Sequence, residues 1–433
     1  MATEQKPADI ATPADAAPLD QILLADTEHW QDGPPHELFA RIRHECPVHW
    51  TSKFSEFPDE AGFWSVTTAE DVHEVSRDWR TYSSEIGGMT ALKNAILPLE
   101  LQQAMFIGMD PPKHDRLKAL FQGGFTPKRI AAHEERIRAI TREVLDHLEG
   151  RDQCDLVTDV AQPVVARVIG SFMGIPPEDD KMWADLMNST LAAADPDLNP
   201  EGIEGVETEV LPKIFASCQK LIAERRANPT DDLTSVLVHA EIDGERLEEH
   251  EIVMGFFLLM AAGNDSTKAT YCSGMRALME DQEQRQLVLD DPTLIPDAVE
   301  EALRMFPAFA HFGRTTTRDT EIHGQQINAG EKVVMWYPSS NRDDTRYENP
   351  NVFDLRRKAE HQAFGAGGRH FCLGTALARL ELKILIEETL ARYPRIRIAG
   401  RPRYVESPFA NQLKTLPVTL NTSRHETGGT ATI

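Results

Sequence analysis

The fold of this chain is decided by the stretch Phe364-Gly-Ala-Gly-Gly-Arg-His-Phe-Cys372-Leu-Gly374. Its glycine-rich first part carries few side chains, so a flat ligand can approach the backbone closely. A single cysteine ends the loop, and alanine and leucine at helical spacing follow directly. Backbone N–H groups at the start of that helix, together with Arg369 and His370, favour the thiolate form of Cys372. A lone cysteine before a helix also fits a buried structural thiol, but the whole stretch favours a thiolate bound to haem iron.

Composition and charge narrow the class of protein. The chain has 433 residues, with 45 Lys and Arg against 69 Asp and Glu, so its formal net charge is −24. Such an acidic chain lacks the basic surface that general nucleic-acid binding or attachment to anionic membranes requires. The five cysteines are sparse and form no disulfide pattern, which fits a reducing cytosol. The N-terminus lacks an apolar signal region and the apolar stretch 253–263 is too short to cross a bilayer, so we expect a cytoplasmic protein without membrane insertion.

The spacing of apolar residues predicts a mainly α-helical protein with small β-sheets near both ends of the chain. Helical spacing is found at residues 130–148, 208–226, 248–280, 297–305 and 374–392. Alternating or β-branched stretches at 47–51, 62–67, 320–324 and 332–337 predict short strands. Because the helix-rich middle offers no linker, we expect one large domain over residues 18–420, with disordered tails at 1–17 and 421–433.

The cysteine stretch resembles the haem-binding loop of cytochrome P450 monooxygenases, and three further segments agree in the order that this family has. The resemblance covers about residues 30–420 and implies the P450 fold, a haem b cofactor (iron protoporphyrin IX) and Cys372 as the iron ligand. It also places Phe364 and Gly374 beside the haem. Many family members have phenylalanine seven residues before the cysteine, whereas Phe364 lies eight before Cys372. That variant resembles a bacterial subgroup that oxidises sterols, terpenoids and branched alkyl chains.

The first further segment is Glu301-Ala-Leu-Arg304, which places an acid and a base on one face of a predicted helix. Such pairs are common on exposed helices, but this one resembles the family's Glu-x-x-Arg ion pair, which braces the haem loop. The family completes the pair with an arginine shortly before that loop. Both Arg356 and Arg357 lie in the right segment, and the spacing does not choose between them.

The second segment, Ala262-Gly-Asn-Asp-Ser-Thr267, lies in the longest predicted helix and resembles the family's oxygen-activating groove. The resemblance implies that Gly263 opens the helix wall to dioxygen and that Asp265 relays protons with the next hydroxyl. That hydroxyl is most often threonine, whereas this chain has Ser266, with Thr267 next. Serine lacks the methyl group that restricts the threonine rotamer. Such residues can also cap or bend a helix; we expect relay through Asp265 and Ser266, with Thr267 as a further catalytic candidate.

Basic residues in several places resemble the family's contacts with the haem propionates. His114 and Lys118 follow a Pro-Pro pair and share a helix face at positions i and i+4. The family usually has arginine at the second position, so Lys118 keeps the charge but loses the bidentate fork. Arg314 and His370 match the other propionate contacts. Taken singly, each of these residues is also compatible with a solvated surface charge.

By position in the family, four regions form the substrate walls: residues 82–109, 192–206, 307–312 and 409–413. Apolar side chains in these regions are typical of a pocket for an apolar molecule, although core packing explains any one of them equally well. The candidates are Met89, Leu92, Phe309, Phe312 and Phe409.

The resemblance implies a haem-thiolate monooxygenase that hydroxylates a bulky apolar molecule, such as a steroid, a terpenoid or an alkyl chain, with dioxygen. No dinucleotide-binding glycine motif follows a predicted strand, so we expect electrons from a ferredoxin and its ferredoxin reductase. Arg116, Lys118 and Arg369 lie on segments facing the cysteine side of the haem, where a basic patch would steer an acidic ferredoxin. The main alternative is a haem-thiolate binding or sensor protein without oxygenase activity, which needs Cys372 but not Asp265. A peroxide-driven haem enzyme and a helical scaffold without a cofactor are further alternatives.

Overall fold

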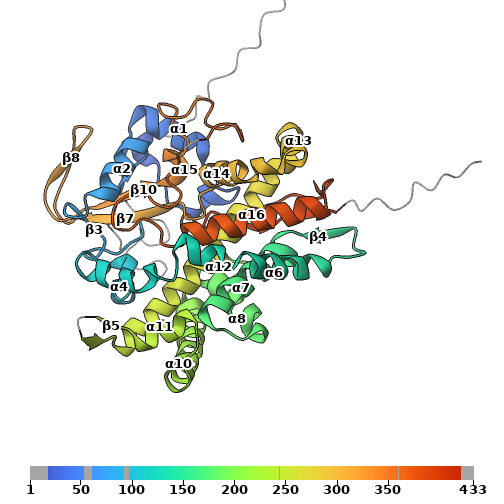
Figure 1. Ribbon diagram of the computed structural model, residues 1–433. Helices are drawn as coiled ribbons and strands as arrows, with labels where there is room; N and C mark the ends of the chain where they lie inside the picture. The colour runs from blue at the N-terminus through green and yellow to red at the C-terminus, as the bar shows by residue number, and fades with distance from the viewer. Residues whose placement is uncertain (1–17, 53–60, 92–96, 243, 359, 421–433) are drawn as a thin grey trace, which may run out of the picture.

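The computed structural model describes residues 18–52, 61–91, 97–242, 244–358 and 360–420. One long helix, α12 (Glu249–Glu280), lies at the centre of the molecule (Figure 1). A capping box formed by Glu248 and Glu251 starts this helix and satisfies N–H groups of its first turn. Most of its side chains from Ile252 to Met279 are buried, as is typical of a core helix that other elements surround.

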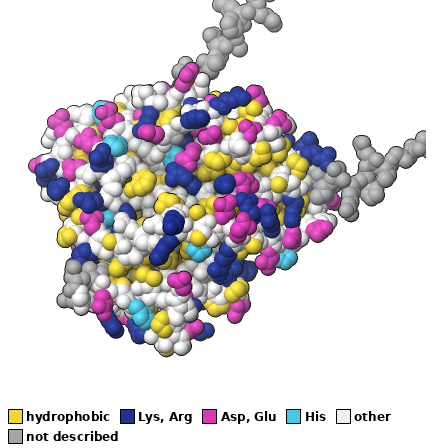
Figure 2. Space-filling view, viewed as in Figure 1, with side chains coloured by type: hydrophobic (Ala, Val, Ile, Leu, Met, Phe, Trp, Pro, Cys, Tyr) yellow, Lys and Arg dark blue, Asp and Glu magenta, His cyan; other side chains and the backbone are white. Residues whose placement is uncertain are grey.

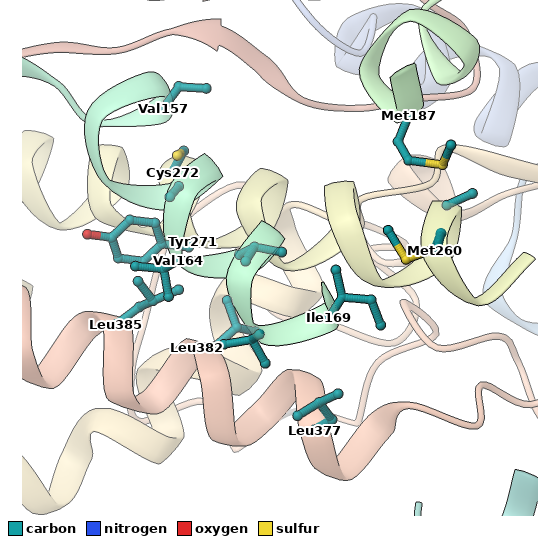
Figure 3. Packing of buried hydrophobic residues seen from close by; sticks show 14 of the residues in the cluster. Val157, Val164, Ile169, Met187, Met260, Tyr271, Cys272, Leu377, Leu382 and Leu385 are labelled. Carbon is teal, nitrogen blue, oxygen red and sulfur yellow. The ribbon is translucent and has the colours of Figure 1, made fainter. Parts of the chain in front are cut away.

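Helices from distant parts of the chain pack around α12. Leu377, Leu382 and Leu385 of α16 (Thr375–Arg392) lie close to Val164 and Ile169 of α7 (Gln162–Met173) in one apolar cluster (Figure 3). Figure 1 shows α8 (Asp180–Leu191), α10 (Leu211–Ala227) and α11 (Leu233–His239) below α12. The other helices of the described residues are α1 (His36–Glu45), α2 (Ala69–Arg77), α3 (Leu99–Gln103), α4 (Lys113–Gln122), α5 (Pro127–Ala131), α6 (Glu134–Asp146), α9 (Gly202–Gly205), α13 (Gln282–Asp290), α14 (Ile295–Met305) and α15 (Tyr337–Ser340).

The larger sheet lies beside α2 in the upper part of the molecule (Figure 1). Its strand order is β1-β2-β10-β7-β3; β10 pairs parallel with β2 and antiparallel with β7. These strands are β1 (Val48–Thr51), β2 (Phe63–Val66), β3 (Tyr82–Ser83), β7 (His311–Thr316) and β10 (Lys332–Trp336). The smaller sheets contain β4 (Gln153–Asp155), β11 (Arg397–Ile398) and β14 (Pro417–Thr419); β5 (Glu241–Ile242) and β6 (Glu245–Arg246); β8 (Thr320–Ile322) and β9 (Gln325–Ile327); and β12 (Arg403–Tyr404) and β13 (Leu413–Thr415).

The predicted fold class is confirmed: a single, mainly helical domain with small sheets. The predicted stretches 248–280 and 374–392 correspond to α12 and α16, but 130–148 is divided between α5 and α6. Two helices are preceded by π-helical turns, at Val157–Ala161 before α7 and at Val206–Val210 before α10. Pro163 and Pro212 follow these turns; because proline has no N–H to donate, the regular ladder is interrupted there.

The predicted tails, 1–17 and 421–433, lie outside the described residues. Within the described part of the chain, no helix is both long enough and apolar enough to cross a bilayer.

Candidate active site

A cavity lies between α12, α16 and the loop that carries Cys372. It encloses about 1430 Å³ of empty space, part of which is open to solvent. Phe364, Cys372 and Gly374 line it from the loop, and Ala262 and Gly263 line it from α12. Further lining residues include His114, Lys118, Ile169, Leu258, Leu259, Ser266, Thr267, Phe309, Phe312, Arg314, His370 and Glu381. The structure therefore brings together most of the site residues predicted from separate segments.

The loop before Cys372 depends on glycine for its shape. Gly365, Gly367 and Gly368 have φ angles of +89°, +92° and +83°, a region that other residues rarely adopt. A Cβ on Gly368 would lie 2.6 Å from the backbone oxygen of Ser76 in α2, so the loop packs against that helix. The Cys372 N–H donates to the Phe364 carbonyl oxygen at 2.9 Å, which closes the span between these two residues.

The Cys372 side chain is exposed to the cavity and otherwise enclosed by protein. Burial raises the pKa of its thiol, and the Gly374 N–H, Lys118 and Arg379 act in the opposite direction. The thiolate-favouring groups predicted from the sequence are thus present in part, but desolvation outweighs them in the protein alone. A thiol that coordinates a metal ion is deprotonated outright, so the balance changes when a cation is bound.

Two histidines and an arginine form a buried basic group at the cavity. The rings of His114 and His370 are 4.3 Å apart between centroids, and Arg314 is buried near them. His114 Nδ1 lies 2.8 Å from an Asp115 carboxylate oxygen, and His370 Nε2 lies 3.1 Å from Ser84 Oγ. Within the described residues, His114 Nε2 and His370 Nδ1 have no hydrogen-bond partner. Burial lowers the pKa of both histidines.

Lys118 braces the cysteine loop. Its ammonium donates to the carbonyl oxygens of Arg369 and Phe371, at 2.6 and 2.7 Å. The side chain is buried, so it adds little to the surface patch that the sequence predicted. Arg369 is exposed there, and its guanidinium pairs with Asp115 at 2.9 Å.

The α12 segment places its polar residues on different faces. Ser266 lines the cavity, and its hydroxyl donates to the Ala262 carbonyl oxygen at 2.7 Å. Asp265 is not among the cavity-lining residues; it is buried and pairs with Lys268, three residues further along the helix. A Cβ on Gly263 would lie 2.6 Å from Ile169 Cδ1, so the glycine also permits α7 to pack closely.

Glu381, on α16, is a site residue that the sequence analysis missed. It lines the cavity, and Thr267 Oγ1 donates to its carboxylate at 2.9 Å. Burial raises the pKa of Glu381 to about 8, so the carboxyl group is protonated at neutral pH. Its position between Leu380 and Leu382 gives a sequence signal, because an acid among apolar residues on a core helix is unusual.

The Glu301–Arg304 pair is fully inside the fold. Arg304 Nε and Nη2 donate to the two Glu301 oxygens at 2.8 and 2.7 Å, and both side chains are at most 2% exposed. The structure distinguishes the two arginine candidates: Arg357 Nε donates to Glu301 at 3.1 Å, whereas Arg356 is exposed. Arg304 also donates to backbone carbonyls at Asn341 and at residues 350 and 352, which connects α14 to the segment before the cysteine loop.

The predicted substrate-wall residues divide into two groups. Phe309 and Phe312 line the cavity, with ring centroids 5.8 Å apart. Phe409 lies behind them, 5.2 Å from Phe309, and Met89 is part of the core; neither belongs to the cavity lining. Leu92 lies outside the described residues.

Comparisons with known proteins agree with this geometry. The Cytochrome P450 family model matches residues 289–398. A methyl-branched lipid omega-hydroxylase of Mycobacterium tuberculosis is 35% identical over 94% of this chain and 96% of its own length. The linalool 8-monooxygenase of Pseudomonas putida is 32% identical over 89% of this chain and 95% of its own. The chain belongs to the cytochrome P450 family. A Mycobacterium marinum P450 solved in complex with pseudoionone has a TM-score of 0.87 to this P450, with 36% identity over 94% of this chain and 100% of the other.

Family membership makes this P450 a monooxygenase with haem b as its cofactor, held through a cysteine thiolate. The residues present fit that group. The unpartnered His114 Nε2 and His370 Nδ1 atoms, next to Arg314, are suited to bind the carboxylates of the haem propionates. The cavity also offers one thiol, that of Cys372, on a loop whose glycines leave space for a flat ring.

Proposed function

We propose that this P450 hydroxylates a bulky apolar small molecule, such as a steroid, a terpenoid or a branched alkyl chain, at an unactivated carbon, using dioxygen. The observation that carries this proposal is that part of the cavity wall is apolar, in contrast to the part formed by basic residues. The apolar part is lined by Ile169, Leu258, Leu259, Phe309 and Phe312. A wall of this kind binds ligands by burying apolar surface. Relatives named for methyl-branched lipids, a steroid C26 position and linalool support the same substrate class.

In this proposal Cys372 ligates the haem iron, and His114, Arg314 and His370 bind the propionates. Bound haem supplies the activation of dioxygen, and its thiolate ligand favours O–O cleavage. Phe364 shields the cysteine side, and Gly374, two residues after the ligand, is the N-cap of α16. Lys118 keeps the loop backbone in place through the two carbonyls that it binds.

Proton supply is assigned to hydroxyl groups that the cavity exposes. Ser266 lines the cavity and is proposed to pass protons into it, with Asp265 behind it in the same helix. Because Lys268 holds the Asp265 carboxylate, that side chain must turn before it can reach the Ser266 hydroxyl. Thr267, which donates a hydrogen bond to the protonated Glu381, is another hydroxyl at this wall.

Electrons are proposed to come from a ferredoxin and its reductase. Arg369 lies three residues before Cys372 and is exposed, and Arg116 follows His114 on α4. Cations at this place suit an acidic electron carrier on a molecule whose net charge is strongly negative.

Purified protein and a surrogate ferredoxin system test the proposal. We expect the reduced, carbon-monoxide-treated holoenzyme to show the long-wavelength absorption of thiolate ligation, and Cys372→Ala to lose it. A spectral-shift screen with steroids, terpenoids, fatty acids and aromatic acids identifies ligands, and product analysis with dioxygen identifies hydroxylation. Thiolate ligation with bound apolar ligands but no product would favour a sensor over a monooxygenase.

A further inference from the structure

A second ion pair lies beside the cysteine loop, one residue before the Glu301 pair. Arg379 Nε and Nη2 donate to the two carboxylate oxygens of Glu300 at 2.6 and 2.9 Å, which is a bidentate contact. His361 holds the same carboxylate from another side, with Nε2 at 3.2 Å. Its Nδ1 accepts from the Ala363 N–H at 3.2 Å, so Nε2 carries the proton and donates to Glu300.

The arginine of this pair lies against the first residue of the cysteine loop. The Arg379 guanidinium lies 4.7 Å from the ring centroid of Phe364, whose carbonyl accepts the Cys372 N–H. Arg379 is also one of the cations that interact with the Cys372 sulfur, and Lys118 is the other. Within the described residues, the hydrogen bonds of Lys118 go to backbone carbonyls and Asp115 acts on it only through space, whereas Arg379 is held by a carboxylate, that of Glu300, in a bidentate contact.

Stability alone gives little reason for this pair. The side chains of Arg379 and Glu300 are 41% and 32% exposed in a groove that Phe364, Gly365 and Phe371 also line. Pairs with this exposure contribute little to folding, because solvent screens them and ordering the side chains costs entropy. Both groups stay charged, since Arg379 and His361 lower the pKa of Glu300 to about 2 although burial opposes this. Of these two charges, Arg379 acts on the Cys372 sulfur, whereas Glu300 is not among the groups that shift the pKa of that thiol.

We propose that Glu300 and Arg379 act as a pair of opposite charges that sets the reduction potential of the haem iron through the Cys372 thiolate. This inference rests on the proposed ligation of haem by Cys372. An electron added to ferric haem makes the site more negative, so the Arg379 cation favours the ferrous state and raises the potential. Glu300 weakens that effect and holds the guanidinium over Phe364. Both are positioning residues, because neither is placed against the substrate or the iron.

The test is a potentiometric titration of the purified holoenzyme, with dithionite as the electron source and mediator dyes. We expect Arg379→Met to shift the potential negatively and Glu300→Gln to shift it positively. The double variant Glu300→Gln/Arg379→Met should return close to the wild-type value. Each single variant breaks the same ion pair, so a mere loosening of the loop would shift both potentials in the same direction. Shifts of opposite sign would therefore come from the charges themselves.

The matched control is Arg392→Met, on the same helix α16. Arg392 pairs with Asp146 and does not line the cavity, and its loss changes the net charge by the same amount. We expect no shift in potential for this variant. Shifts of the same sign in both single variants, or no shift in either, would overturn the inference while the carbon-monoxide spectrum still reports thiolate ligation. Absence of that spectrum in the wild type would instead overturn the ligation on which the inference rests.

Discussion

Single residues of the cavity wall differ in what they can do because their surroundings differ. Ser266 offers a hydroxyl to the cavity, whereas Asp265, its neighbour, is held in a buried ion pair by Lys268. Successive residues on an α-helix point about 100° apart, so neighbours in the sequence need not share a surface. The role of each side chain at this wall must therefore be argued from its own position and contacts.

The Ser266 hydroxyl should determine how many electrons lead to product. We expect Ser266→Ala still to consume NADH through the ferredoxin system but to form at least about 10-fold less product per NADH. A positioned proton donor contributes about 10²–10⁴-fold to the reaction rate, and the variant lacks that donor. Ser266→Thr keeps the hydroxyl and should retain most of the yield. Product and NADH are measured together. Equal yields from the alanine variant and the wild type would exclude Ser266 as the proton donor.

Glu381 should make stability depend on pH. Because its folded pKa of about 8 lies above the ordinary value of 4.5, the folded protein keeps a proton that the unfolded chain releases between these pH values. The free energy of unfolding should therefore fall as the pH rises through this window, by at most about 1.4 kcal/mol per pH unit from this group. Urea unfolding of wild type and Glu381→Gln at pH 5.5 and 8 gives the difference. Parallel pH profiles would show that Glu381 is not protonated in the fold.

Helix starts and the cysteine loop are predictable from nearby residues, whereas the pairing of distant strands is not. The starts of α12 and α16 follow from local signals, namely the acids at 248 and 251 and the glycine at 374. The cysteine loop is equally local, since its glycines and Cys372 are contiguous. The pairing of β2 with β10 is not predictable in this way, because the two strands are far apart in the chain. The sequence marks Glu381 as an unusual acid among apolar residues, but its contact with Thr267 on another helix is not predictable from it.

The choice between Arg356 and Arg357 illustrates the same limit, and it can be tested. Arg357→Ala removes a hydrogen bond to the buried Glu301 carboxylate and should lower the free energy of unfolding by about 1.5–3 kcal/mol. Arg356→Ala, one residue earlier and exposed, should change it by less than about 0.5 kcal/mol. Urea titrations of both holoenzymes provide the comparison. Equal losses would mean that the contact with Glu301 contributes nothing of its own.

The glycine-rich loop before Cys372 packs against α2, and the contact at Gly368 can be tested. Gly368→Ala adds a Cβ 2.6 Å from Ser76 O at a φ of +83°, so it should loosen the loop from α2 and weaken haem retention. Gly324→Ala has a similar φ, +76°, but nothing within 4 Å of the added Cβ, and should cost only about 1–2 kcal/mol of backbone strain. Haem transfer to apomyoglobin measures retention. Equal release rates would show that the contact with Ser76 is unimportant.

At the scale of the whole molecule, charge is abundant but mixed. Lys and Arg side chains are interspersed with Asp and Glu over the face shown in Figure 2, although the net charge is −24. An acidic partner is therefore repelled by the molecule as a whole and attracted only where cations are concentrated. Long-range repulsion is screened at physiological ionic strength, over a Debye length of about 8 Å, whereas contacts at the docking site are screened less.

Local and global charge can be separated with two variants that change the net charge equally. Arg369→Gln removes a cation beside the cysteine loop, and Lys181→Gln removes one from α8, where the lysine is 86% exposed. At low ionic strength we expect several-fold slower reduction by ferredoxin for Arg369→Gln and little change for Lys181→Gln, since steering depends on where the charge lies. Stopped-flow reduction across a salt series measures this, with the carbon-monoxide spectrum as a check that the haem site is intact. The difference should vanish at high salt, because screening removes the attraction that Arg369 provides. Equal slowing by both variants would mean that only the net charge matters and that the cysteine face holds no docking site for an acidic electron carrier.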